Sequence, residues 1–181
     1  MNNSIAKLRD HLVPFLFETM EGSSASYEGQ KVKMIRLLPA SSLASYLYSA
    51  IEYDYKKGNK TEDRFFLYLS ITKKNSFQFS GTIYIENKGV KNELILSSDK
   101  IRSINNLFED IFRVSIVSYI DGCNAGGLEI SKSCEKFIEK YNLDEYDFSA
   151  NQIRKMYYEA KKKALLRRFQ NRSVNNIIGF F

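Results

Sequence analysis

Residues 65–85 read FFLYLSITKKNSFQFSGTIYI, and this stretch indicates the fold class more clearly than any other part of the chain. Toward both of its ends, apolar residues alternate with polar or aromatic ones. A period of two places alternate side chains on the same face of a β-strand. The stretch therefore predicts an antiparallel hairpin with one buried face, formed by Phe65, Leu67, Leu69, Ile71, Phe77, Phe79, Gly81, Ile83 and Ile85.

The strand pattern continues on either side of this hairpin. Asn87-Lys88-Gly89 has the composition of a turn, and residues 90–96 then repeat the apolar alternation, which predicts a third strand. Residues 31–38 alternate in the same way and stop at Pro39, so they predict another short strand. The segment 21–30, which is rich in Ser and Gly, is interpreted as a loop. Together these segments predict a small antiparallel β-meander.

Two segments before the hairpin carry apolar residues at helical spacing. The first predicted helix spans about residues 4–20, with Ser4 as its N-cap and a kink at Pro14. The second spans about residues 41–57. Because the apolar face of a sheet must pack against another layer, the second helix is expected to cover the meander together with a third helix over about residues 98–120.

A third helix is predicted after the meander, over about residues 98–120, and Gly122 fits its C-cap. The end of this segment, residues 113–120, is rich enough in β-branched residues to fit a strand as well. Strands and helices that follow one another in separate groups are typical of the α+β class. We therefore predict an α+β fold.

The last part of the chain predicts a pair of helices. A short helix is expected over residues 132–143. Ser149 followed by Gln152 then matches a capping box, which predicts that a second helix begins at Ser149 and runs to about Phe169. The apolar stripe of this second helix consists of Ile153, Met156, Tyr157, Ala160 and Ala164.

The positive charge of the chain is concentrated in that second helix and the residues after it. The whole chain has a net charge of +6. Residues 151–172 contain eight cations and one anion, Glu159, so this segment carries +7 and the remainder of the chain carries −1. A nearly neutral protein with one basic element suggests a polyanionic partner.

This pair, with its short connection at residues 144–148, resembles small helix-turn-helix modules in which the second helix contacts nucleic acid. The cations of the second helix predict binding of DNA or RNA mainly by phosphate contacts, and the lack of a catalytic constellation favours an accessory or regulatory protein over an enzyme. An alternative interpretation is a solvated, charge-rich helix that packs on the body of the protein. The predicted nucleic-acid-binding residues are Arg154, Lys155, Tyr158, Lys161, Lys162, Lys163, Arg167, Arg168 and Arg172.

The chain ends in an apolar tail whose candidate partner-binding residues are Ile177, Ile178, Phe180 and Phe181. Exposed phenylalanines lose a few kcal/mol of burial free energy, so the tail is expected to dock on this domain, on a second copy or on another protein. Its spacing resembles the C-terminal peptides by which replication and repair proteins bind sliding clamps. The alternative function is therefore a non-enzymatic protein-interaction module that acts through this tail or through the edge of the sheet.

One resemblance points to enzyme chemistry. Glu86-Asn87-Lys88, with Asp63 and Glu52 before it, is similar in order to the metal-binding residues of the restriction-endonuclease-like family, which implies metal-dependent DNA cleavage. Residues of opposite parity lie on opposite faces of a strand, so Asp63 and Glu86 are not expected to share an ion. We interpret Glu86-Asn87-Lys88-Gly89 as a hairpin turn and predict no catalytic residues.

The remaining sequence features bear on cofactors, cellular compartment and domain organisation. Two cysteines, Cys123 and Cys134, and a single histidine, His11, are too few for a disulfide framework or a four-ligand zinc site, so no metal or cofactor is expected. The low cysteine count favours a reduced, cytoplasmic setting, and no apolar run reaches the length of a membrane span, so no membrane partner is expected. Residues 1–130 are interpreted as an α+β core, 131–172 as the basic helical segment and 173–181 as the tail, all in one compact unit.

Overall fold

The computed structural model describes residues 3–20, 23–27, 30–37, 41–51, 64–71, 79–87, 90–146 and 148–162. The chain forms two compact units, residues 1–107 and residues 108–181. The boundary between them lies inside the long helix α3 (Ser98–Ala125).

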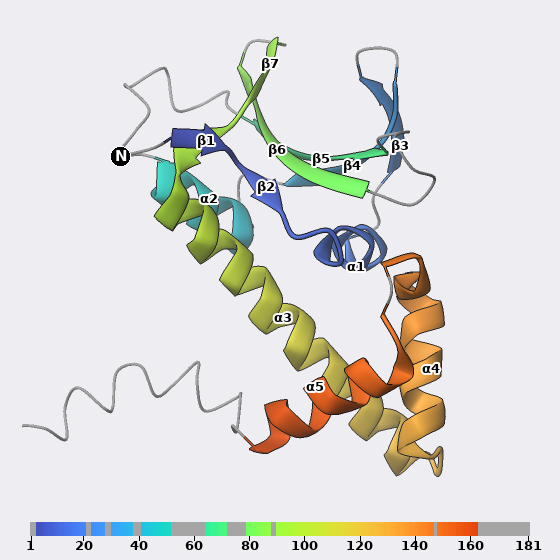
Figure 1. Cartoon of the computed structure of the whole chain (residues 1–181). Coiled ribbons are helices and arrows are strands. Elements are labelled where there is room, and N and C mark those ends of the chain that lie inside the picture. The colour runs from blue at the N-terminus through green and yellow to red at the C-terminus, as the bar shows by residue number, and fades with distance from the viewer. Residues whose placement is uncertain are drawn as a thin grey trace, which may run out of the picture. The chain divides into compact units, whose positions relative to one another are not determined.

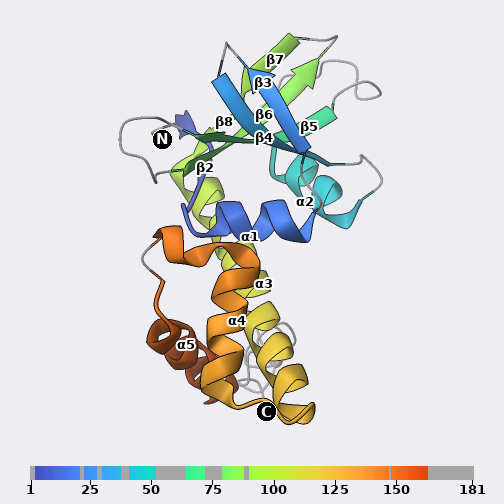
Figure 2. The same ribbon diagram turned by 90° about the vertical axis from the view of Figure 1, so that its right-hand side faces the viewer.

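The first unit contains a β part with two antiparallel sheets, together with helices (Figures 1 and 2). The larger sheet has the strand order β2-β6-β5-β4-β3, with β7 paired to β6, and the smaller one pairs β1 with β8. Helices α1 and α2 lie below the larger sheet in both views. The predicted α+β class is therefore confirmed. The strands are β1 (Asn3–Ile5), β2 (Lys7–Leu8), β3 (Ser23–Tyr27), β4 (Gln30–Leu37), β5 (Arg64–Ile71), β6 (Phe79–Asn87), β7 (Val90–Glu93) and β8 (Ile95–Ser97), and the helices are α1 (Leu12–Thr19) and α2 (Ser42–Ile51).

The predicted meander is present, and β5, β6 and β7 are neighbours in sequence order with antiparallel register. Phe65 pairs with Ile85, and Asn87 pairs with Val90 across the turn. The expectation of a single buried face is wrong at the centre of β6, where Thr82 and Tyr84 are buried as well as Ile83. An interior strand has neighbouring side chains on both sides, which reduces the exposure of both of its faces.

The N-terminal segment corrects the prediction of one helix over residues 4–20. Its first residues form β1 and β2, and α1 begins only at Leu12. Ala6 lies between β1 and β2, and Leu94 lies between β7 and β8. Ala6 N donates to Leu94 O (2.8 Å), Ile83 N donates to Ala6 O (3.0 Å), and Leu94 N donates to Ile83 O (2.9 Å). These three bonds join the two sheets. Pro14 lies in the first turn of α1, where backbone N–H groups have no intrahelical acceptor, so it does not interrupt the helix.

The segment 21–30 was expected to be a loop, but Ser23–Tyr27 forms β3. Its register with β4 runs from Ser23 opposite Met34 to Tyr27 opposite Gln30, which makes the two strands a hairpin. A polar sequence is compatible with a strand at a sheet edge, because backbone groups rather than side chains form the ladder. Strand β4 begins at Gln30, one residue before the predicted segment, and helix α2 forms within the segment predicted for it. Residues 52–57 of the expected helix lie outside the described residues.

A buried amide fastens the N-terminal segment to the first turns of α3. Asn105 Nδ2 donates to Lys7 O (2.8 Å) and Ile101 O (3.0 Å), while its Oδ1 accepts from Arg9 N (2.8 Å). Both amide donors and the carbonyl are thus satisfied, as a buried polar side chain requires. This residue explains why the segment before α1 is held in place although it forms only short strands.

Helix α3 is continuous from Ser98 to Ala125, so the strand alternative for residues 113–120 is wrong. The predicted C-cap at Gly122 is also wrong, because the helix passes through this exposed glycine. The helix ends instead in a Schellman motif, where Gly127 has a φ of 86°. There Gly127 N donates to Asn124 O (2.9 Å) and Leu128 N donates to Cys123 O (3.0 Å).

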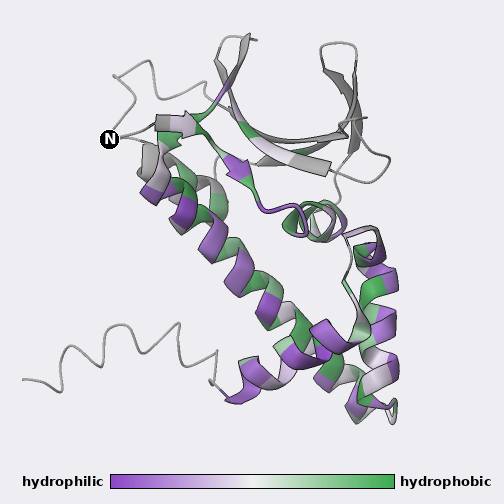
Figure 3. Cartoon of the chain, in the orientation of Figure 1, coloured by the Kyte–Doolittle hydropathy of each residue, from purple (hydrophilic) through white to green (hydrophobic). Residues whose placement is uncertain are grey.

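The second unit consists of the C-terminal part of α3 and two further helices. Helix α4 (Ile130–Tyr141) ends at Asn142, which adopts the left-handed conformation, and the short 3-10 helix η1 (Leu143–Tyr146) leads to α5 (Ala150–Lys162). Phe137 of α4 is the centre of the core, with ring centroids 5.9 Å from Phe112 and 4.7 Å from Tyr141. The hydropathy colouring shows apolar and polar residues interleaved along α4 and α5, as expected for amphipathic helices (Figure 3).

Candidate nucleic-acid interface

Helix α5 begins where the sequence predicts. Ser149 N donates to Gln152 Oε1 (2.6 Å), and Gln152 N donates to Ser149 Oγ (3.3 Å). These reciprocal bonds form the predicted capping box, which satisfies two backbone donors that lack intrahelical acceptors. The start of the helix is therefore fixed, and with it the direction in which each later side chain points.

One face of α5 is buried and the opposite face is exposed. Of the predicted apolar stripe, Ile153, Tyr157 and Ala160 are buried, Met156 is half-buried, and Ala164 lies outside the described residues. At about 100° per residue, Lys155, Tyr158 and Lys162 project within roughly 60° of one another on the opposite side, with Arg154 beside them. All the predicted binding residues in the described part of α5 are exposed, namely Arg154, Lys155, Tyr158, Lys161 and Lys162.

The two adjacent tyrosines of α5 have different environments. Tyr157 is 2% exposed and belongs to the core, whereas Tyr158 is 53% exposed. The edge of one ring contacts the other, with centroids 5.2 Å apart and an angle of 65° between the ring planes. Only Tyr158 is therefore available for contact with a partner.

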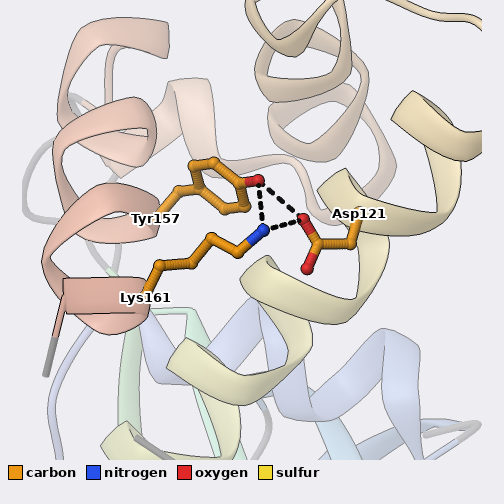
Figure 4. A network of polar contacts seen from close by, with 3 residues as sticks. All are labelled: Asp121, Tyr157 and Lys161. Atoms are coloured by element: carbon orange, nitrogen blue, oxygen red, sulfur yellow. Dashed lines mark hydrogen bonds and ion pairs between the residues drawn. The ribbon is translucent and has the colours of Figure 1, made fainter. Parts of the chain in front are cut away.

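Lys161 is engaged with the protein itself. Its Nζ donates to Asp121 Oδ1 (2.8 Å) and to the hydroxyl oxygen of Tyr157 (3.1 Å), and that hydroxyl donates to the same Asp121 oxygen (2.6 Å; Figure 4). The hydrogen bond from Lys161, followed by the one from Tyr157, lowers the pKa of Asp121. The hydrogen bond to Asp121 is also the main cause that raises the pKa of Lys161 to about 12. Lys161 thus joins α5 to α3 as a cation whose charge is balanced by Asp121.

Sequence reasoning missed Asp121, although it predicted Lys161. The spacing of Tyr157 and Lys161, four residues apart, places both side chains on neighbouring helix positions. No local pattern connects them with a carboxylate 36 to 40 residues earlier in the chain. Asp121 is therefore a long-range partner that only the packing of α5 against α3 identifies.

The other cations of α5 are not engaged in this way. No hydrogen bond or ion pair joins Arg154, Lys155 or Lys162 to any residue that the structure describes. The single acidic residue of α5, Glu159, is half-buried, while these three cations are exposed. The predicted residues Lys163, Arg167, Arg168 and Arg172 lie outside the described residues, as do Ile177, Ile178, Phe180 and Phe181 of the tail.

The neighbouring helix α4 has a different electrostatic character. Its exposed cations Lys132 and Lys136 alternate with the exposed Glu135 and Glu139. Lys140 lies over the rings of two tyrosines, at 5.3 Å from the centroids of both Tyr119 and Tyr141. Helix α4 thus carries three cations and two anions, whereas α5 carries four cations and one anion.

Neither a metal centre nor a membrane-spanning helix is found in the part of the chain that the structure describes. Within the described ranges, no group of three or more His, Cys, Asp and Glu side chains could hold a metal ion. Asp63 and Glu52 of the nuclease-like pattern lie outside those ranges. Cys123 and Cys134 are free thiols, and burial raises the pKa of Cys134. Of the helices described, none has both the length and the apolar composition that a bilayer span requires.

The solvent face of α5 is thus the strongest candidate for an interface among the described residues. It combines three exposed cations with an exposed aromatic ring on a helix of fixed register. Comparison with other proteins adds no constraint, since no protein-family model, curated protein or solved structure matches this chain.

Proposed function

We propose that this protein binds nucleic acid through the solvent face of α5, as an accessory or regulatory protein. The observation that supports this most directly is the exposure of Arg154, Lys155 and Lys162 on one face, without an ion pair to any described carboxylate. Cations that have no ionic partner among the described residues are available for phosphates. Four further cations follow in the sequence at Lys163, Arg167, Arg168 and Arg172, which extends the basic segment.

The binding free energy in this proposal comes mainly from phosphate contacts. Each lysine or arginine that neutralises a phosphate releases condensed counterions, so affinity falls steeply as salt concentration rises. Phosphate contacts position a protein on nucleic acid but carry little sequence information. The proposal therefore implies binding with a strong salt dependence and a weak preference for base sequence.

A second candidate function is protein interaction through the edge of the larger sheet. In the described sheet, β3 pairs on one side with β4 and ends the strand order on the other. An edge strand offers unpaired backbone donors and acceptors, which an extended peptide can use to add a strand. In that case the cations of α5 would be a solvated face.

The test is fluorescence anisotropy of the full chain with labelled oligonucleotides over a series of salt concentrations. The double variant Lys155→Gln/Lys162→Gln is compared with the matched control Lys132→Gln/Lys136→Gln, which removes the same charge from exposed positions on α4. Far-ultraviolet circular dichroism checks that both variants remain folded.

We expect the α5 variant to bind more weakly and to reduce the slope of log K against log salt by roughly 0.7 to 0.9 for each phosphate that it no longer neutralises. The α4 variant should retain the wild-type slope. Equal weakening in the two variants would contradict the proposal. Absence of binding by the wild-type chain at low salt would also contradict it, and would favour the sheet-edge function.

A further inference from the structure

The exposed ring of Tyr158 is the feature that phosphate contacts do not explain. Among the described residues of the second unit, it is the one large hydrophobic side chain that is exposed. Each of the other aromatic residues on α4 and α5, namely Phe137, Tyr141 and Tyr157, is buried. An aromatic side chain left in water forfeits burial free energy, which makes it a candidate contact for a partner.

The position of Tyr158 on the helix places it among the unpaired cations. Arg154, Lys155 and Lys162 lie four residues before, three before and four after it, and residues at these spacings are neighbours on a helix surface. Asn151, also exposed, lies on the same face one turn before Lys155. The ring is thus surrounded by groups that attract phosphates, over a helix length of about 12 Å.

The orientation of the ring is restricted. Its ring lies in a tilted, edge-type contact with the ring of Tyr157, whose hydroxyl donates to Asp121. A tyrosine has two side-chain torsions, so a ring held by a neighbour loses little further conformational entropy when it contacts a partner. Tyr158 is therefore a preorganised aromatic surface.

Resting on the proposed function, we infer that α5 takes single-stranded nucleic acid, with an unpaired base stacked on Tyr158 and the flanking phosphates on Arg154, Lys155 and Lys162. An aromatic face between basic side chains is the arrangement by which proteins bind single strands with little sequence preference. In a duplex the faces of the bases are stacked on one another, and a tyrosine on the outside meets sugars and phosphates instead.

Two observations favour the single strand over the duplex. Phosphate contacts alone accept either form, so the discrimination comes from the ring. Lys161, which would add a fourth cation to the face, is already engaged with Asp121, leaving three exposed and unpaired cations around one aromatic side chain in the described part of α5. The exposed ring of Tyr158 beside these cations is the second observation, because its face can stack on an unpaired base.

The test measures the affinity of the full chain for three probes at one salt concentration: an oligo(dT), an oligo(rU) and a DNA duplex with the same number of phosphates. Tyr158→Ala is compared with Tyr158→Phe, which keeps the ring and removes the hydroxyl. Tyr46→Ala is a control at another exposed tyrosine, in the first unit. Because the side chain of Tyr158 is exposed, both of its variants are expected to fold, and circular dichroism checks this.

We expect the wild-type chain to bind at least one of the single strands more tightly than the duplex. Tyr158→Ala should weaken single-strand binding about 5- to 150-fold, which corresponds to about 1–3 kcal/mol for one stacked base, while Tyr158→Phe and Tyr46→Ala leave it nearly unchanged. A preference for oligo(dT) or oligo(rU) would identify DNA or RNA as the natural strand.

Two results would overturn this inference and leave the proposed function intact. One is tighter binding to the duplex than to both single strands. The other is an equal affinity of Tyr158→Ala and the wild-type chain for the single strands. Failure of the proposed function has a different signature, since the wild-type chain would then bind none of the three probes at low salt.

Discussion

Helices α4 and α5 are built alike on their buried sides and differently on their exposed sides. They have 12 and 13 residues, and each places an aromatic residue in the core of the second unit. On the exposed side, α4 alternates lysines with Glu135 and Glu139, whereas α5 presents Arg154, Lys155 and Lys162 without a described ionic partner. Packing thus determines one face of each helix, and the other face is free to carry a function.

The largest loss of stability is expected from a substitution on the buried side that the two helices share. Phe137 contacts Phe112, Tyr119 and Tyr141 and is fully buried. Phe137→Ala should lower the free energy of unfolding by about 3–5 kcal/mol, because it removes buried apolar area and leaves a cavity. Urea denaturation measures this, with the exposed Lys136→Ala as a control that should change stability by less than about 0.5 kcal/mol. A decrease of less than about 1 kcal/mol for Phe137→Ala would show that the core is not centred on this ring.

A smaller effect should distinguish the starts of the two helices. Ser149 caps α5 with a side-chain hydrogen bond, while Glu129 at the N-cap of α4 makes none. Ser149→Ala should therefore cost about 1 kcal/mol and increase hydrogen exchange in the first turn of α5. Glu129→Ala should leave the first turn of α4 nearly as protected as before. The comparison fails if both substitutions have the same effect on their helices.

The smallest effect, and the one that depends on pH, concerns the bond between α5 and α3. The folded state lowers the pKa of Asp121, chiefly through the hydrogen bond from Lys161. The contribution of the network is therefore present above the ordinary carboxyl range and is lost as pH falls through the lowered pKa of Asp121. At high pH it is lost between the ordinary pKa of lysine and about 12, as Lys161 releases its proton.

Urea denaturation of the wild-type chain and of Asp121→Asn at a series of pH values measures this contribution. The difference in stability should be present at neutral pH and shrink toward low pH, and it should remain smaller than the effect of Ser149→Ala because both ionic side chains are well exposed. The control Glu135→Gln removes a carboxylate from the exposed face of α4, outside the network of Asp121, Tyr157 and Lys161. A difference that grows on acidification would mean that Asp121 does not act as the described acceptor.

The sequence predicted best those features that depend on neighbouring residues. The capping box located the start of α5, and strict alternation located β5 and β6. The segment before α1 was misassigned because Ile5, Leu8 and Leu12 fit helical spacing, although the partners of β1 and β2 lie more than seventy residues later. Pairing over that distance leaves no local pattern in the sequence.

The candidate interface was predicted only in part, because its long-range contacts also leave no local pattern in the sequence. Charge alone identified the cations of α5 but treated Lys161 as equal to Lys162, because the bond to Asp121 arises from tertiary packing. Tyr157 and Tyr158 are adjacent in the sequence, but only the structure shows that Tyr157 is buried and Tyr158 is exposed. The capping box fixes where the helix begins, and Ile153 and Ala160 fix which face is buried. Together they place Tyr157 in the core and Tyr158 in solvent.

The most direct test of the difference between the two helices is a nitrogen-15 nuclear magnetic resonance titration of the full chain with whichever of oligo(dT) and oligo(rU) it binds more tightly. We expect the largest changes in amide chemical shift in residues 151–162 of α5, around Lys155 and Tyr158, while residues 130–141 of α4 change little. Changes concentrated on α4 or on the strands of the first unit, or no changes at low salt, would contradict this expectation.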